Sequence, residues 1–176
     1  MVYLVSVARL QRVYAPLNLS ETVFSVIVQA HCDVLETGLA TGNERVVVID
    51  LDLGEVFDDN IGTPNEVYFS DDMDYTRKYL IIHNHPRNNT FSPQDIYTFL
   101  DVLPISCSVV QGHDGSVYVF HKLKHMRYAL SSHYFDDLFY DLLESEKGGT
   151  ASFEEVRDIF IQRVVEQFHL SYRKVV

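Results

Sequence analysis

Apolar and polar residues follow two periods in the first quarter of the chain. Residues 1–14 alternate between the two classes, and this alternation predicts a strand. Ser20 is a good N-cap, and the apolar residues behind it recur at helical spacing. We expect a helix there that ends at Gly38 and Gly42.

A β-branched run, RVVVIDL, opens the next part of the chain. It predicts a strand to about Leu53 that turns at Gly54 and resumes, as in a hairpin. Residues 57–66 are polar and predict a loop, and EVYFS at 66–70 predicts a short strand. The polar stretch 71–79 is compatible with one or two helical turns.

The middle of the chain contains a short apolar run followed by a strong helix start. YLII at 79–82 predicts a buried strand, and residues 83–90 predict a loop. Ser92 is an N-cap and Pro93 suits the first helical position, so we expect a helix to about Leu103.

The last third changes from strands to helices. SCSVVQG and SVYVFHK predict two strands joined by a turn at 113–115. SSHYFDDLFYDLLESEK and ASFEEVRDIFIQRVVEQFHL predict two amphipathic helices joined by Gly148 and Gly149. Ser152 and Glu155 have the spacing of a capping box for the second helix.

These elements predict a mixed α/β (α+β) fold with a central mixed sheet flanked by helices. We expect one domain over residues 1–130 and a C-terminal helical pair over 131–176 that packs on it. The apolar stripe of this pair would cover the sheet or form a homodimer interface, and it comprises Phe139, Leu142, Leu143, Phe160, Val164 and Phe168.

The net charge and the cysteine content indicate which partners and which cellular compartment to expect. The net charge is −11, from 14 basic and 25 acidic residues, and no basic cluster stands out, which argues against nucleic acid as a partner. Cys32 and Cys107 form no CxxC pair, which favours a reducing compartment, and we expect a cytoplasmic protein. We also expect no membrane partner, because the N-terminus resembles neither a signal peptide nor a membrane span.

Two histidines follow the buried YLII run. If the strand continues through His83 and His85, both imidazoles point to one face of the sheet. Asp95 lies ten residues after His85, in the first turn of the next helix, and a strand–loop–helix return brings it back over the strand end. Two imidazoles and one carboxylate form a donor set that Zn²⁺ accepts, with a fourth position for water.

Each part of this pattern also has an ordinary structural explanation. Histidines are common at strand ends, and Ser92 with Asp95 is a good capping arrangement that suits the helix dipole. The combination of both parts is what points to a metal site. The other histidines show no ligand spacing and are interpreted as structural or solvated: His31, His113, His121, His125, His133 and His169.

At these residues the sequence resembles the JAMM/MPN (JAB) metallopeptidases, a family that includes isopeptidases and bacterial and phage relatives. HNHP at 83–86 matches the HxHP element of the family, and Ser92 with Asp95 matches its S-x-x-D element. Glu44 stands where the family has an acid at the start of an early strand. The resemblance covers residues 20–122.

The resemblance implies a zinc-dependent hydrolase with a JAB/MPN-like fold. His83, His85 and Asp95 would hold Zn²⁺, which lowers the pKa of a bound water toward about 7. Glu44 would act as the general base, and Ser92 would donate a hydrogen bond to the developing oxyanion. The implied substrate is a protein or peptide, with a ubiquitin-like conjugate among the candidates.

Three alternatives stay open. Glu36 and Glu55 are rivals to Glu44, although the first falls at a helix end and the second beyond a turn. The loop PRNNTF is one residue shorter than is usual in the family, which is the only sequence support for an inactive scaffold or binding module of the same fold. HNHP is also typical of the RadC branch, a DNA-associated group, although the missing basic patch argues against it.

Overall fold

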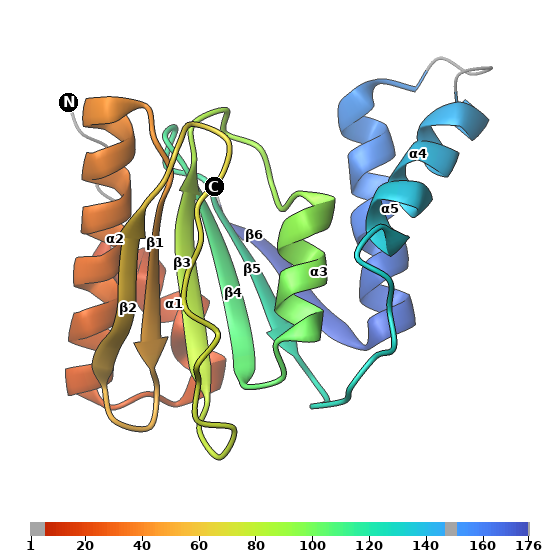
Figure 1. The fold of residues 1–176 in the computed structure, drawn as a ribbon. Coiled ribbons are helices and arrows are strands. Elements are labelled where there is room, and N and C mark those ends of the chain that lie inside the picture. The colour runs from red at the N-terminus through yellow and green to blue at the C-terminus, as the bar shows by residue number, and fades with distance from the viewer. Residues whose placement is uncertain (1–5, 147–150, 176) are drawn as a thin grey trace.

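A six-stranded mixed sheet lies between two layers of helices in the computed structural model, which describes residues 6–146 and 151–175 (Figure 1). The strand order is β2-β1-β3-β4-β5-β6. The strands are β1 (Arg45–Asp50), β2 (Glu55–Ile61), β3 (Tyr79–His85), β4 (Ile105–Gly112), β5 (Val117–Lys122) and β6 (Leu170–Val175). The α-helices are α1 (Val7–Tyr14), α2 (Glu21–Thr41), α3 (Pro93–Asp101), α4 (Tyr134–Glu146) and α5 (Phe153–Phe168), with a short 3₁₀ turn η1 (Ala15–Leu17) after α1.

One parallel strand pair decides where the site lies. β3 and β4 are parallel, whereas the other neighbouring strands of the sheet are antiparallel. Parallel neighbours need a crossover connection, and α3 provides it. The crossover returns the chain from the end of β3 through α3, so the first turn of α3 lies near the last residues of β3 (Figure 1).

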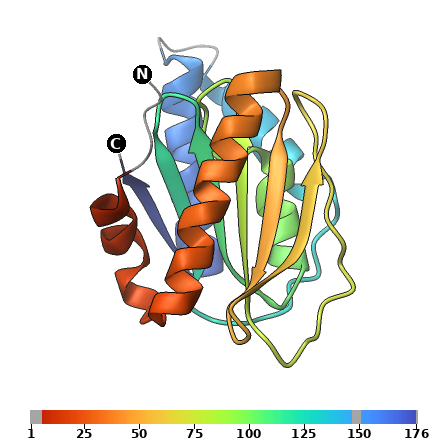
Figure 2. The same ribbon diagram turned by 90° about the vertical axis from the view of Figure 1, so that its left-hand side faces the viewer.

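Each face of the sheet has its own hydrophobic core. α1 and α2 cover one face, where Ile27 and Val34 pack against Val47 and Ile82. α3, α4 and α5 lie on the other face, and their core contains an aromatic cluster of Phe99, Phe120, Phe135, Phe160 and Phe168. Figure 2 shows α2 lying across the strands on its side of the sheet. The chain therefore forms a three-layer sandwich.

Helix α2 is unusually long and apolar, and its position in the fold explains this composition. By length and composition alone it is the one helix among the described residues that is apolar enough to cross a membrane. In the fold it is a core helix, because Ile27, Ala30 and Val34 are buried against the sheet. Glu21, Ser25 and Glu36 lie on the outer side of the same helix, whereas His31 is buried on the inner side.

The predicted mixed α/β fold and its C-terminal helical pair are confirmed. α2 begins after the Ser20 N-cap and ends at Gly42, which has φ 73° as a helix-ending glycine requires. Gly38, predicted as part of this end, lies inside the helix. The capping box of Ser152 and Glu155 is formed.

The predicted strand over residues 1–14 is wrong where the structure describes it, because Val7–Tyr14 is helix α1. Ser6 caps this helix by accepting a hydrogen bond from the backbone N–H of Arg9. Leu10, Val13 and Tyr14 are buried at helical spacing. The short segment fits both periods, and packing against α2 decides between them. Residues 1–5 of the prediction lie outside the described residues.

The predictions for residues 57–79 also need correction. β2 extends to Ile61 through residues predicted as loop, because pairing with β1 outweighs the polar sequence of an edge strand. The predicted strand at 66–70 has only one isolated bridge, between Thr63 and Glu66. Residues 71–79 contain a turn and no helix.

Smaller differences occur at other element ends. The strand predicted to Leu53 ends at Asp50, and the helix predicted to Leu103 ends at Asp101. The C-terminal residues after His169, which has φ 52°, form strand β6 on the far edge of the sheet and were not predicted. The expected junction at residues 148–149 lies outside the described residues.

Candidate metal centre

Strand β3 brings two imidazoles together at its end. The strand continues through His85, beyond the predicted end at residue 82, so His83 and His85 lie on one face of the sheet, and both are buried. Their Nε2 atoms are 3.1 Å apart, and the ring planes are inclined by 66°. Pro86 follows at once and takes the chain out of the sheet.

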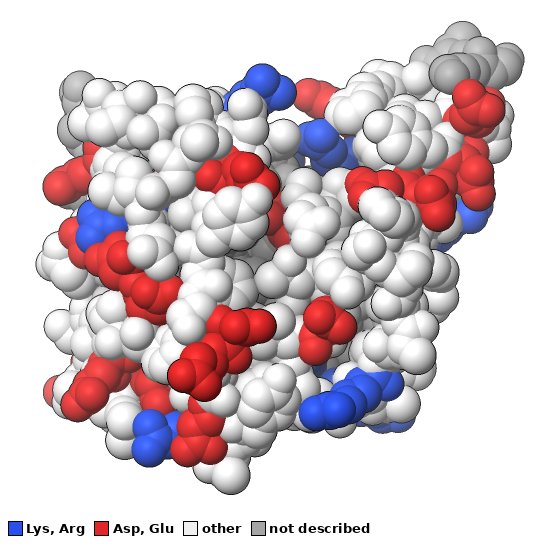
Figure 3. All heavy atoms as spheres, in the orientation of Figure 1, with Lys and Arg blue, Asp and Glu red and all other residues white. Residues whose placement is uncertain are grey.

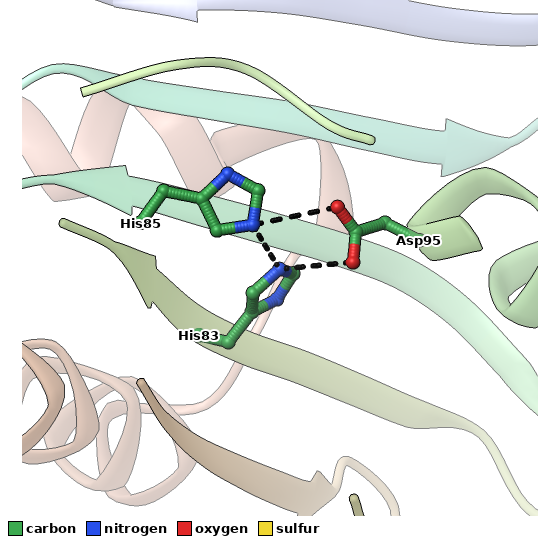
Figure 4. Close-up of side chains that lie close together, drawn as sticks. All are labelled: His83, His85 and Asp95. Atoms are coloured by element: carbon green, nitrogen blue, oxygen red, sulfur yellow. Dashed lines mark hydrogen bonds and ion pairs between the residues drawn. The ribbon is translucent and has the colours of Figure 1, made fainter. Parts of the chain in front are cut away.

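Helix α3 supplies the third donor. Ser92 and Pro93 begin the helix with a capping box, which places Asp95 in the first turn as predicted. The carboxylate points from the helix toward both rings (Figure 4). Asp95 Oδ1 is 3.4 Å from His83 Nε2, and Asp95 Oδ2 is 3.4 Å from His85 Nε2.

The three donor atoms have the separations that a single metal ion requires. In a tetrahedral zinc site with bonds of about 2.0–2.1 Å, two ligand atoms are about 3.3 Å apart. The three observed contacts, 3.1, 3.4 and 3.4 Å, agree with this spacing. His85 Nδ1 also donates to the carbonyl oxygen of Asn89 at 3.2 Å, which leaves Nε2 as the free ligand nitrogen. This group could therefore bind a metal ion.

The ionisation of these groups suits a cation. Burial acts to raise the pKa of Asp95, but the neighbouring His83 and His85 hold that pKa well below its ordinary value. Burial acts to lower the pKa of His85, but the Asp95 carboxylate, with a further contribution from Glu44, raises it above its ordinary value. The carboxylate is thus ionised and ready to bind a cation, and a metal competes with a proton at His85.

Glu44 lies just before β1 and faces the same side of the sheet as the histidines. The β1–β3 register pairs Val46 with His83, and its continuation by two residues places Glu44 opposite His85. The Glu44 backbone is bonded on its other side, because its N–H donates to Thr63 O and its carbonyl accepts from Gly62 N–H, both at 2.9 Å.

The carboxyl group of Glu44 is held partly out of water. Burial is the main cause that raises its pKa, from 4.5 to about 7, with Asp95 and Glu66 adding to the rise and His85 opposing it. A carboxyl group with a pKa near neutrality exchanges protons readily at the pH of the cell. Glu44 is therefore the candidate general base whose carboxyl group interacts electrostatically with His85 and Asp95.

The pKa of Glu44 predicts a pH-dependent stability in metal-free protein. Between about pH 4.5 and about pH 7 the folded state binds more protons than the unfolded state, so stability falls as the pH rises. Glu44→Gln removes this loss, and we expect it to unfold with a free energy on the order of 1 kcal/mol above wild type at about pH 8, because solvent screens a half-buried carboxyl.

Urea unfolding with a chelator at several pH values measures this difference. We expect it to shrink as the pH falls from about 7 to about 4.5 and to be lost below that, where the carboxyl is protonated in both states. Glu55→Gln is the matched control, since Glu55 is exposed at the start of β2. A stability difference that is independent of pH would contradict the prediction.

Ser92 is less available than the resemblance implies. Its Oγ–H donates to Asp95 Oδ2 at 2.7 Å, and its Oγ accepts from the Asp95 N–H at 3.1 Å. Its backbone N–H also donates to Asp95 Oδ2, at 2.6 Å. Ser92 thus orients the carboxylate, and any donation to a substrate requires the hydroxyl to leave Asp95.

The rival acids and the other histidines lie apart from this cluster. Glu36 is exposed on α2, which covers the opposite face of the sheet, and Glu55 begins β2 at the end of the sheet opposite Glu44. His31 is buried between the Tyr14 hydroxyl and the Gln111 side chain, at 2.8 and 2.7 Å, which is a structural role.

A groove leads away from the cluster. It has a volume of about 670 Å³ and runs between residues 65–71 and helix α3, with His83 and Asp95 in its wall. Glu66 and Asp71 contribute carboxylates, and none of the described residues that line it is Lys or Arg. Acidic side chains predominate on this side of the molecule (Figure 3). The sequence reasoning missed this groove, because residues 65–71 have no periodic pattern.

Comparisons with known proteins do not assign the site. No family model, curated protein or solved structure matches the chain. The site is therefore defined by the geometry of His83, His85 and Asp95 and by the charge of Glu44 beside them.

Proposed function

We propose that the protein is a zinc-dependent metallopeptidase that hydrolyses a peptide or isopeptide bond. The observation that carries this proposal is the convergence of His83 Nε2, His85 Nε2 and the Asp95 carboxylate, with Glu44 close enough to interact electrostatically. Two imidazole nitrogens and one carboxylate at tetrahedral spacing favour zinc over magnesium or calcium, which prefer sets of oxygen ligands.

The proposed reaction assigns different roles to the residues around the site. Zinc in this site would act as a Lewis acid and lower the pKa of a water molecule. Glu44 has the position and the near-neutral pKa to take up a proton at its carboxyl oxygen and transfer it to the leaving amine. Asn89 orients His85, and Ser92 orients Asp95.

The groove supports a polypeptide as the substrate. Its volume is in the range of ligand sites in general, and its lining follows α3 from Ser92 to Val102, which suits an extended segment. Val46 and Ile81 offer an apolar floor, while Glu66 and Asp71 supply negative charge. The same charge opposes the phosphates of DNA, so the alternative of a DNA-associated protein is the weaker one.

The other alternative is a fold of the same kind that has lost turnover. The engagement of the Ser92 hydroxyl by Asp95 favours it, since the predicted oxyanion donor is occupied. The inactive alternative is compatible with a bound metal, so hydrolysis is the property that separates the two hypotheses.

Two measurements test the proposed function. Elemental analysis of purified protein should find about one zinc per chain. Incubation with libraries of peptides and with lysine-linked isopeptides should then show cleavage that a chelator abolishes and added zinc restores. Zinc without cleavage would support the inactive alternative, and protein that neither contains nor binds a transition metal would refute the proposal.

The acidic lining predicts a preference for basic substrates. We expect Glu66→Gln combined with Asp71→Asn to reduce kcat/KM for a peptide carrying Lys or Arg by about tenfold, because each lost charge pair contributes up to about 1 kcal/mol. A neutral peptide should be affected less than twofold or so. Asp72→Asn is the matched control, since Asp72 does not line the groove. Equal losses for both peptides would contradict the prediction.

A further inference from the structure

The residue between the two histidines points to the opposite face of the sheet, as alternation requires. Asn84 is completely buried. Its Oδ1 accepts a hydrogen bond from the backbone N–H of Arg45 at 2.7 Å, and its Nδ2 donates to the backbone carbonyl of Asn43 at 3.0 Å. These two backbone groups lie on either side of Glu44.

Beyond the end of the β1–β3 pairing, the Asn84 side chain makes the hydrogen bonds that backbone groups of β3 would otherwise make. Regular pairing between β1 and β3 reaches Val46 opposite His83 and stops there. The N–H and carbonyl of Glu44 itself are bonded toward the β2 side, to Thr63 and Gly62. On the β3 side, the backbone around Glu44 is held by the amide of Asn84.

The amide is fixed in its own position by close packing. The second hydrogen of Nδ2 faces His113 Nε2 at 3.1 Å, so every polar atom of the Asn84 side chain has a partner. Helix α2 closes over it at Gly38, where an added Cβ would lie 2.4 Å from Asn84 Nδ2 and 2.2 Å from His113 Nε2. Gly38 therefore serves close approach of the helix.

We propose that Asn84 is a positioning residue that fixes Glu44 relative to the strand carrying the metal ligands. This role rests on the proposed function, because it assigns Glu44 to the reaction. Strand β3 thus carries both His83 and His85 and also Asn84, which orients Glu44. The position of Glu44 relative to the two histidines is therefore fixed by a single strand. Misplacement of a reacting group by about 1 Å costs about a hundredfold in rate.

The first test needs no catalysis. In metal-free protein, we expect Asn84→Ala to raise the amide hydrogen exchange rate of Arg45 by at least about tenfold, since its acceptor is lost. Gln111→Ala is the matched control. Gln111 is the neighbour of Asn84 on β4, is equally buried and bonds to His31 instead. Unchanged exchange at Arg45 in Asn84→Ala would overturn the proposal.

The second test is a double-mutant cycle in zinc-loaded protein. We expect Asn84→Ala to lower kcat about a hundredfold with KM and zinc affinity changed less than about twofold. In the Glu44→Gln background the same substitution should cost less than about twofold, because the residue that it positions is already lost. Additive losses, or a fall in zinc affinity, would place the effect of Asn84 elsewhere and overturn the proposal.

A variant of the same size as asparagine covers the case in which the cavity left by Asn84→Ala prevents folding. Asn84→Asp retains the acceptor for the Arg45 N–H and loses the donor to Asn43, so we expect normal Arg45 exchange and a smaller loss of kcat. Equal losses in both variants would contradict positioning through Arg45. If wild type shows no hydrolysis at all, the proposed function fails, while the exchange measurement still decides whether Asn84 holds the backbone at Glu44.

Discussion

Replacing His83 with alanine is expected to lower zinc affinity by more than about a hundredfold. That is the upper range for losing an outer-shell partner, and the proposal makes His83 a ligand itself. His83 Nε2 is 3.1 Å from His85 Nε2 and 3.4 Å from Asp95 Oδ1, so the substitution removes one corner of the donor triangle. Isothermal titration of metal-free protein with zinc measures the change. Hydrolysis should be lost in parallel.

The control for this prediction is another histidine. His133→Ala removes an exposed imidazole before α4, outside the cluster, and should leave zinc affinity and hydrolysis at the wild-type level. Circular dichroism of His83→Ala should show a folded protein, because removal of the ring leaves the backbone pairing of β3 in place. Full zinc binding by His83→Ala would remove the basis of the proposed metal centre.

Glu44→Gln is expected to reduce kcat by about a hundredfold to about ten-thousandfold while zinc stays bound. Gln has nearly the same size as Glu but takes up no proton, and Glu44 is not among the three residues whose donor atoms converge. Zinc content by elemental analysis and turnover of the best peptide from the library measure the two effects separately.

The rival acids provide matched controls for Glu44. Glu36→Gln and Glu55→Gln make the same chemical change at exposed positions away from the cluster, and both variants should keep wild-type kcat. A large loss in either would show that the general base has been assigned to the wrong residue. Loss of zinc from Glu44→Gln would instead make Glu44 a ligand.

The three candidate metal donors could be predicted because short-range signals determine their positions. The apolar run before His83 predicts a buried strand, and Ser92 with Pro93 predicts the start of α3 within one residue. Given those two elements, the crossover brings Asp95 back to the end of β3. Nothing in the chain far from these residues is needed for that inference.

Elements that depend on distant partners could not be predicted in the same way. β2 is polar and becomes a strand because β1 lies beside it, and β6 follows α5 directly and pairs with β5. The eight residues of α1 fit both the helical and the strand period, and the segment is a helix because it packs against α2. Local propensity is a weak guide where tertiary contacts decide.

The surroundings of the site were missed for a related reason. Glu66 lies on a segment without regular structure, and its place in the groove depends on the path of the chain around β2. Asn84 had one available signal, namely that alternation turns it away from its two neighbours toward α2. What it bonds there, at Asn43 and Arg45, follows only from the assembled sheet.

The capping box of α3 has a consequence for how a cation would enter and leave the candidate metal centre. Asp95 is bonded to Ser92, and His85 to the Asn89 carbonyl, by groups of the chain alone. Asp95 and His85 thus keep their orientation without a bound ion, so binding an ion would cost little conformational entropy at these two side chains. Reloading of chelator-treated protein with zinc should be fast and reversible. Cobalt(II) should bind to the same three side chains and give the protein a visible absorption spectrum.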